Sequence, residues 1–330
     1  MMNALRLMLN EKQNKCKICG NLEKNRYHIA REMMFGYRDE FLYMECGSCG
    51  VLQLINVPES IEKYYPSNYY SFFPQNKYSI LVRQIYSALT YKNGLLGDII
   101  MNICSKNDAI LSLKRLKIKE NQRILDIGCG SGQLLLMLKF LGFDDIMGID
   151  PYIKKDILYS NGVKICKKEL EEVKDIFDII MLHHVFEHMD QPQKIMNNLS
   201  RILSPNGRII IRLPIASSYA WHHYGVNWMH MDPPRHFYLY TLKSIEILCR
   251  NACMHIEKII YESNESQFIG SEQNVKNIPI INPRSYFYYP FPQFLKFFFI
   301  HHYLVYANQL NNKENGDLVC FYLRKNKNSN

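Results

Sequence analysis

The sequence predicts an α/β protein in which a doubly wound, mostly parallel sheet follows a small module with four cysteines. Short apolar strands alternate with helical segments between residues 123 and 213, and two Cys-x2-Cys pairs lie within the first 50 residues. Strands and helices that alternate at this spacing are typical of a parallel sheet covered on both faces. The 330 residues have room for one large α/β domain and a small additional one.

The composition is that of an ordinary folded protein, with 47% hydrophobic and 22% charged residues. The net charge of +9 is spread along the chain, so a solvated basic surface explains it as well as an anionic partner does. No run of 18 apolar residues occurs, and the first residues lack a signal-peptide pattern. The closest run, Phe291–Tyr306, is interrupted by a lysine and two histidines, which favours a core helix covering the sheet edge over a helix that docks on a membrane or a partner. We therefore expect a cytoplasmic protein without a transmembrane span.

The four-cysteine module is expected to bind zinc. Each Cys-x2-Cys turn brings two thiolates to one side of a tight loop, and two such turns supply four soft ligands at tetrahedral geometry. Disulfides are disfavoured in a reducing compartment, and two matching pairs argue against a redox site. Because the protein supplies all four ligands, the ion is expected to be structural. The predicted ligands are Cys16, Cys19, Cys46 and Cys49.

The predicted elements follow the chain in a regular order. Residues 1–57 form a zinc-ribbon-like module with strands at Phe41–Glu45 and Val51–Ile55, and residues 58–106 form an aromatic connector with a helix at Tyr78–Met101. The connector tyrosines Tyr64, Tyr65, Tyr69 and Tyr70 are interpreted as a lid over a ligand, with a packed connector as the alternative.

A second helix at Asn107–Leu116 leads into the α/β domain, and a Ser-Pro-Asn-Gly turn at 204–207 leads into its fifth strand. Its expected strands are Arg123–Ile127, Ile146–Ile149, Lys164–Cys166, Phe177–Leu182, Arg208–Leu213, Ile256–Tyr261 and Asp317–Leu323, and its expected helices are Gln133–Leu141, Gln191–Leu203 and Leu242–Ala252.

A glycine-rich loop joins the first of these strands to its helix. Gly128, Gly130 and Gly132 permit a tight turn and let a ligand approach the backbone amides. A Gly-x-Gly pattern by itself also occurs in NAD enzymes, but their fingerprint places a glycine at position 133, where this chain has Gln133.

Two acidic residues further restrict the ligand of this loop. Asp126 lies just before the first glycine, where a carboxylate would repel a pyrophosphate but suits a ligand that carries ammonium and sulfonium cations. Asp150 ends the second strand about 20 residues further on, where an acid can accept both hydroxyls of a ribose.

These motifs resemble those of class I S-adenosylmethionine (SAM)-dependent methyltransferases. The resemblance includes the loop at 124–132, Gly148-Ile-Asp150, the segment Phe177–His188 and the turn at 204–207 with the strand after it. It implies a Rossmann-like sheet that is mostly parallel, an antiparallel last strand at Asp317–Leu323, a methyltransferase domain over 107–330, and SAM as the cofactor.

The same resemblance implies roles for individual residues. The glycine loop would line the methionine portion of SAM, Asp150 would hold the ribose, and the segment around Glu169 would approach the adenine, although Glu171 matches that position equally well. The implied cofactor-binding residues are Asp126, Gly128, Cys129, Gly130, Gly132, Asp150, Pro151, Glu169, Leu170, His183 and His184.

The acceptor side is predicted to involve the loop at 214–240. Its segment Asp232–His236 resembles methyltransferases of surface-polysaccharide and deoxysugar pathways, in which a zinc-binding module also precedes the methyltransferase domain. This implies a sugar or glycan precursor as the small-molecule acceptor and His236 as a general base, with a structural or substrate-orienting role as the alternative for His236 and with His184 the second catalytic candidate. Those enzymes are typically longer, which counts against C-methylation of a sugar nucleotide. His188 is expected to cap or pack a helix.

Three other functions compete with this interpretation. An RNA methyltransferase is possible because the charge is positive, but acidic residues offset the basic ones in the zinc module. A non-catalytic adaptor with a degenerate Rossmann domain is disfavoured by the intact glycine loop. An NAD-dependent oxidoreductase is disfavoured by Gln133.

Overall fold

The structure is a computed structural model that describes residues 14–65, 108–287 and 293–326, with the side chains of 293–299 left aside. The helix predicted at Tyr78–Met101 lies outside these residues, and so do Tyr69 and Tyr70.

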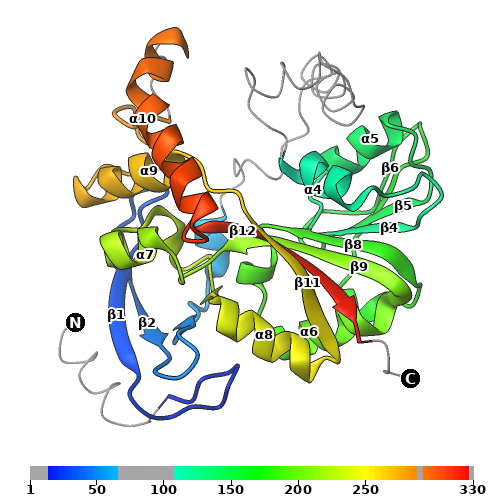
Figure 1. The fold of residues 1–330 in the computed structure, drawn as a ribbon, viewed down its shortest axis with the longest axis horizontal. Helices are drawn as coiled ribbons and strands as arrows, with labels where there is room; N and C mark the ends of the chain where they lie inside the picture. Colours follow the sequence, from blue (N-terminus) through cyan, green and yellow to red (C-terminus); the bar gives the residue numbers. More distant parts are fainter. Residues whose placement is uncertain (1–13, 66–107, 288–292, 327–330) are drawn as a thin grey trace.

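An eight-stranded mixed sheet forms the centre of the larger part, in the order β11-β12-β9-β8-β4-β5-β7-β6 (Figure 1). β4 pairs in parallel with β5 and β8, β8 pairs in parallel with β9, and β12 runs antiparallel to both of its neighbours. The predicted Rossmann-like methyltransferase sheet, including its antiparallel last strand, is therefore confirmed. The strands are β4 (Ile124–Ile127), β5 (Ile146–Ile149), β6 (Ile157–Leu158), β7 (Lys164–Cys166), β8 (Phe177–His183), β9 (Leu203–Pro214), β11 (Met254–Tyr261) and β12 (Leu318–Lys325).

Helices cover both faces of this sheet. α4 (Asp108–Leu116) and α5 (Gln133–Phe140) lie on one face, and α6 (Pro192–Ile202) and α8 (Leu242–Asn251) on the other (Figure 1). Successive side chains of a strand point to opposite faces. Accordingly, Ile124 of β4 packs with the first helix pair and Leu125 with the second.

The Ser-Pro-Asn-Gly segment at 204–207 was expected to precede the fifth strand as a turn. In the structure it lies inside β9, which begins at Leu203. Phe177 of β8 pairs with Leu203, but Ile179 pairs with Arg208, so the segment forms a bulge opposite Asp178. The Ser204 hydroxyl donates a hydrogen bond of 2.8 Å to the Asp178 carboxylate, which holds the bulge in place.

A second sheet, in the order β1-β2-β3-β10, contains the N-terminal module (Figure 1). Its strands are β1 (Arg26–Arg31), β2 (Glu40–Glu45), β3 (Leu52–Leu54) and β10 (Tyr238–Leu239), followed in sequence after β3 by the short helix η1 (Ile61–Tyr64). Both predicted module strands are present, whereas β1 was not predicted. The boundary at residue 57 stays a prediction, but the last strand of this sheet comes from the predicted acceptor loop.

The acceptor loop and the module are joined by further hydrogen bonds. The Leu54 amide donates to the Phe237 carbonyl at 2.8 Å, and the Thr241 hydroxyl donates to the Cys49 carbonyl at 2.6 Å. The cysteine pairs also pack in the same buried cluster as one face of the large sheet. The module therefore fixes the position of the acceptor loop.

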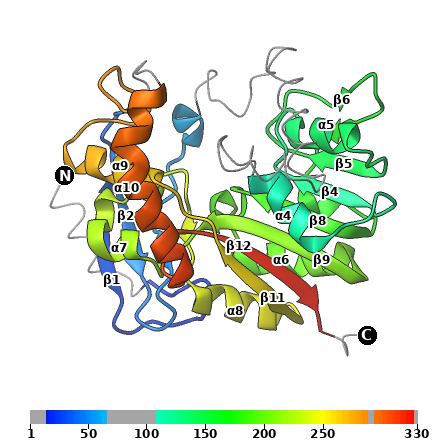
Figure 2. The ribbon, with the colours of Figure 1, turned by 45° about the horizontal axis from the view of Figure 1, so that its top comes forward.

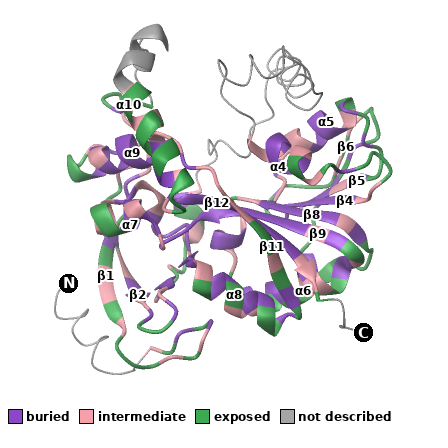
Figure 3. Cartoon of the chain, in the orientation of Figure 1, coloured by how far each residue is buried: buried purple, intermediate pink, exposed green. Residues whose placement is uncertain are grey.

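α7 (Tyr219–Tyr224), α9 (Ser266–Val275) and α10 (Gln293–Asn312) form a separate layer beside the second sheet (Figures 1 and 2). α10 contacts this layer through Tyr303, Ala307 and Leu310, while most of its other described side chains are at least partly exposed (Figure 3). The expected core helix is therefore wrong for the described side chains up to Tyr306, none of which is buried, although α10 does contact the edge strand β11. Within the described ranges, no helix combines the length and apolarity needed to cross a bilayer.

Candidate active site

The glycine loop between β4 and α5 has the conformation that its sequence predicts. Gly128, Gly130 and Gly132 have φ angles of 68°, 54° and 75°, in the left-handed region that favours glycine. Packing also excludes side chains here, because a Cβ atom on Gly128 would lie 2.6 Å from Val185 Cγ2. A Cβ atom on Gly132 would clash with Ile165 Cδ1. The loop therefore packs directly against the segment that follows β8.

Asp150 holds this loop against the end of β5. Its carboxylate accepts hydrogen bonds from the backbone amides of Gly130 at 2.9 Å and Tyr152 at 2.8 Å. Burial raises the pKa of Asp150, and these two amides partly oppose that shift. The residue predicted to bind a ribose thus also fixes the loop that it faces.

Asp126 is buried at the end of β4, with 4% of its surface exposed. Burial raises its pKa to about 8, and the negative charge of Asp150 contributes to the rise. No cation of the described residues pairs with Asp126 within 4.0 Å. A cationic ligand beside it would favour the ionised form, so the site is built to gain from a positive charge.

The remaining predicted cofactor residues have different environments. Cys129 lies against β5, where a Cβ atom on Gly148 would clash with its sulfur, and Pro151 is half-buried. Glu169 is exposed and begins the short helix η3 (Leu170–Glu172), whereas Leu170 packs into the core. Among these residues, Glu169 therefore remains more accessible to a ligand than Leu170.

His183 and His184 end β8 with different surroundings. His183 is half-buried as a whole, but both of its ring nitrogens are buried and have no hydrogen-bond partner among the described residues. Burial holds its pKa well below the usual range, so the ring is neutral. His184 has a φ of 55°, its side chain is 42% exposed, and its Nδ1 lies 3.6 Å from Glu187 Oε1.

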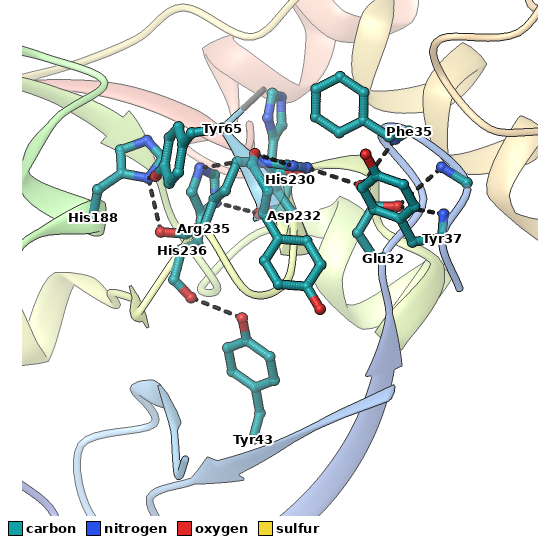
Figure 4. Close-up of polar contacts among 12 residues, drawn as sticks. Glu32, Phe35, Tyr37, Tyr43, Tyr65, His188, His230, Asp232, Arg235 and His236 are labelled. Atoms are coloured by element: carbon teal, nitrogen blue, oxygen red, sulfur yellow. Dashed lines mark hydrogen bonds and ion pairs between the residues drawn. The ribbon is translucent and has the colours of Figure 1, made fainter. Parts of the chain in front are cut away.

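The structure brings His236 next to His188, with ring centroids 4.7 Å apart. The Nδ1 atom of His236 is 2.7 Å from the His230 carbonyl, and that of His188 is 2.8 Å from the Arg235 carbonyl (Figure 4). Burial and the neighbouring His188 lower the pKa of His236 to about 4. The neutral His236 ring can therefore accept a proton from an acceptor group. His188, expected to cap or pack a helix, belongs to this cluster, in the short helix η4 (Phe186–His188).

A buried ion-pair network holds the segment that carries His236. Arg235 is fully buried and pairs with Asp232 through two contacts, one of them 2.9 Å from Nε to Oδ2. Its Nη2 also lies 3.3 Å from Glu32, whose carboxylate accepts the amides of Phe35, Gly36 and Tyr37 at 2.9 Å each (Figure 4). Glu32 and Arg235 were missed as site residues, because nothing local in the sequence links positions 203 residues apart.

The two described connector tyrosines differ in role. Tyr64 is buried, its ring packs against Phe41, and its hydroxyl donates to Asp39 at 2.7 Å. The lid interpretation is therefore wrong for Tyr64, which is a packed connector residue. The Tyr65 hydroxyl lies 3.2 Å from His188 Nδ1, so this residue does border the histidine cluster (Figure 4).

The four module cysteines converge as predicted. The four Sγ atoms all lie within 4.8 Å of one another. The Sγ–Sγ distance is 3.7 Å between Cys16 and Cys49 and 3.5 Å between Cys19 and Cys46. Zn–S bonds of about 2.3 Å in a tetrahedron require sulfurs about 3.8 Å apart. The amides of Ser48 and Cys49 lie 3.4 and 3.5 Å from the Cys46 sulfur, as donors to a thiolate would. The residues present fit a structural zinc ion.

Comparisons with known proteins find methyltransferases. A protein family described as "Methyltransferase domain" matches residues 104–252. The ubiquinone biosynthesis O-methyltransferase of Rickettsia canadensis is 34% identical over 96 residues, which are 27% of this chain and 41% of the relative. That of Rickettsia bellii is 27% identical over 173 residues, 46% of this chain and 70% of the relative. The chain thus spans less than half the length of the first of these relatives.

Among solved structures, an O-methyltransferase from a trans-AT PKS multienzyme of Brevibacillus brevis, in complex with S-adenosyl-L-homocysteine, is similar with a TM-score of 0.39 and 15% identity. The similarity covers 83% of this chain and 81% of that one.

Proposed function

We propose that this protein transfers the methyl group of SAM to a small-molecule acceptor. The observation that carries the proposal is Asp126, which is buried beside Asp150 at the glycine loop and has no ion-pair partner among the described residues. A buried acid next to a second acid disfavours the phosphates of a dinucleotide, whereas a cofactor with a sulfonium and an ammonium group stabilises its ionised form. The match of residues 104–252 to the methyltransferase domain family supports the same cofactor.

The donor site we propose follows the loop and the strand ends. Gly128, Gly130 and Gly132, with Cys129 between them, give the methionine portion access to the backbone, and Asp126 faces its charged groups. Asp150 and the adjoining Pro151 receive the ribose, and the exposed Glu169 with Leu170 borders the adenine. His183 and His184, at the end of β8, border the methyl group.

On the acceptor side we propose a hydroxyl group and His236 as the general base. The acceptor oxygen loses its proton to Nε2 of His236, attacks the methyl carbon in line, and the carbon–sulfur bond breaks, leaving its electron pair on sulfur. His184 is the second candidate for the base. The named relatives are O-methyltransferases, which supports an oxygen acceptor. A sugar or glycan precursor is the first class to test, on the resemblance of the segment 232–236.

We further propose that the four cysteines hold a structural zinc ion. Its task is to fix the module, because the Cys49 carbonyl and Leu54 both bind the segment 237–241. Zinc thus supports the acceptor side without taking part in methyl transfer.

The experiment is calorimetric titration with SAM and NAD, followed by transfer of labelled methyl groups. SAM is expected to bind at micromolar concentration and NAD not to bind. Asp150→Ala should weaken SAM binding at least tenfold, whereas Asp156→Ala, at an exposed position, should not. Nucleotide sugars, phenols and ribosomal RNA then serve as acceptors. Absence of SAM binding overturns the proposal, and methylation of RNA alone replaces the small-molecule acceptor with the nucleic-acid alternative.

A further inference from the structure

We propose that Glu187, His188 and His236 form a second metal site, for a divalent transition cation such as Zn²⁺, distinct from the four-cysteine site. One ligand atom from each of the three side chains lies within 4.8 Å of the others. Bonds of about 2.0–2.2 Å to nitrogen and oxygen place tetrahedral ligands about 3.3–3.6 Å apart, so closure needs side-chain shifts of at most ~1.5 Å.

The hydrogen bonds of the two histidines prepare them as ligands. A carbonyl oxygen only accepts, so the contacts of His188 Nδ1 with the Arg235 carbonyl and of His236 Nδ1 with the His230 carbonyl put the proton on Nδ1 in each ring. The lone pair of each neutral imidazole is then on Nε2. A metal-binding histidine typically donates its other N–H to a carbonyl or carboxylate in this way, which fixes both the tautomer and the ring orientation.

Glu187 supplies the independent observation that points to a cation. Its side chain is 0% exposed, and neither carboxylate oxygen has a hydrogen-bond partner among the described residues. The nearest cationic group is His184 Nδ1, 3.6 Å away, on a side chain that is itself 42% exposed. Buried carboxylates are normally paired, hydrogen-bonded or bound to a metal. A cation held between Glu187 and the two imidazole rings would satisfy the carboxylate and the free lone pair of each ring.

The donor set indicates the class of metal. Two imidazole nitrogens and one carboxylate suit zinc and its neighbours in the first transition row, whereas Mg²⁺ and Ca²⁺ prefer oxygen ligands throughout. Three protein ligands leave at least one position open on a four-coordinate ion, unlike the closed four-cysteine site.

The location connects the site to the chemistry. Val185, two residues before Glu187, packs against Gly128 of the glycine loop, so the cluster adjoins the proposed SAM site. Resting on the proposed function, we assign the open position to the acceptor oxygen. Binding there lowers the pKa of the hydroxyl. With a metal bound, His236 would be a ligand in place of the base proposed above, and the hydroxyl proton would pass to solvent as the oxygen attacks the methyl carbon and the carbon–sulfur bond breaks.

The test measures metal content on the full-length protein, purified, stripped with a chelator and reloaded with Zn²⁺ or Co²⁺. Two equivalents per chain are expected. Glu187→Gln, which keeps the shape of the side chain, and His236→Ala should each lower the content to one. Cys46→Ser combined with Cys49→Ser should remove the other equivalent. The exposed His223 provides the control, and His223→Ala should retain both.

Cobalt spectra separate the two sites, because only the cysteine site gives thiolate-to-metal charge-transfer bands. The bands should persist in Glu187→Gln, which also shows that this variant folds, while the weaker ligand-field bands of the second site disappear. One equivalent in the wild type, lost only in the cysteine variants, overturns the proposal. Methyl transfer at full rate with one equivalent bound overturns it while leaving the proposed function intact. Two equivalents of metal without SAM binding would support the second metal site and overturn the proposed function.

Discussion

Replacement of Asp126 by Asn tests the electrostatics of the donor site. The change removes the charge and keeps the size of the side chain. In the folded protein the pKa of Asp126 is raised by burial from 3.8 to about 8. At pH 7 the unfolded chain is therefore ionised at this position and the folded chain is protonated. The roughly three pH units between 3.8 and 7, at about 1.36 kcal/mol each, correspond to about 4 kcal/mol that folding must supply.

The sign of the effect follows from proton binding. Because the folded state holds the extra proton between about pH 4 and pH 8, the contribution of Asp126 to stability falls as the pH rises through that window and is constant above it. Asp126→Asn lacks this dependence. We expect the variant to exceed the wild type in free energy of unfolding by about 2 kcal/mol at pH 5 and about 4 kcal/mol at pH 7.

Denaturant unfolding at pH 5, 7 and 9 measures this difference, with Asp144→Asn as the control at an exposed ion pair. That control should change stability by less than ~1 kcal/mol. SAM titration of the same proteins should show weaker binding by the Asp126 variant. For the wild type, affinity should rise with pH up to about 8, because the cationic ligand binds the ionised acid. Equal stability of variant and wild type at all three pH values, or a flat affinity profile, would refute the reasoning.

Three further substitutions have defined outcomes. Cys46→Ser should lose zinc and lower the melting temperature, since its sulfur also accepts two amides; unchanged zinc content by elemental analysis would contradict the assignment. Arg235→Met should cost about 3–5 kcal/mol in urea unfolding, because it leaves the buried Glu32 carboxylate without its ion pair, and a loss below ~1 kcal/mol would argue against the network. Gly132→Ala should destabilise more than Gly162→Ala, since both have positive φ but only the first meets a neighbouring side chain; equal losses in thermal unfolding would show that packing is irrelevant there.

The sequence determined the central sheet and the donor loop because their signals are local. Strand ranges such as Ile146–Ile149 and Lys164–Cys166 agree with the structure residue for residue, since buried parallel strands are short apolar runs bounded by polar turns. The glycines of the loop were predictable for the same reason, because a left-handed backbone requires that residue type. The Cys-x2-Cys spacing likewise predicts locally that the two thiolates of each pair lie on the same side of a tight loop.

Tertiary structure alone decided how the acceptor side is assembled. β10 completes the module sheet from 238–239, and Glu32 meets Arg235 across 203 residues, so no window of sequence contains either pairing. Glu187 was not predicted as a site residue, and His188 was expected only to cap or pack a helix. Their proposed role depends on the approach of His236 and on a buried carboxylate that has no hydrogen-bond partner among the described residues. Burial and long-range contact, which set the chemistry of these groups, are properties of the folded chain.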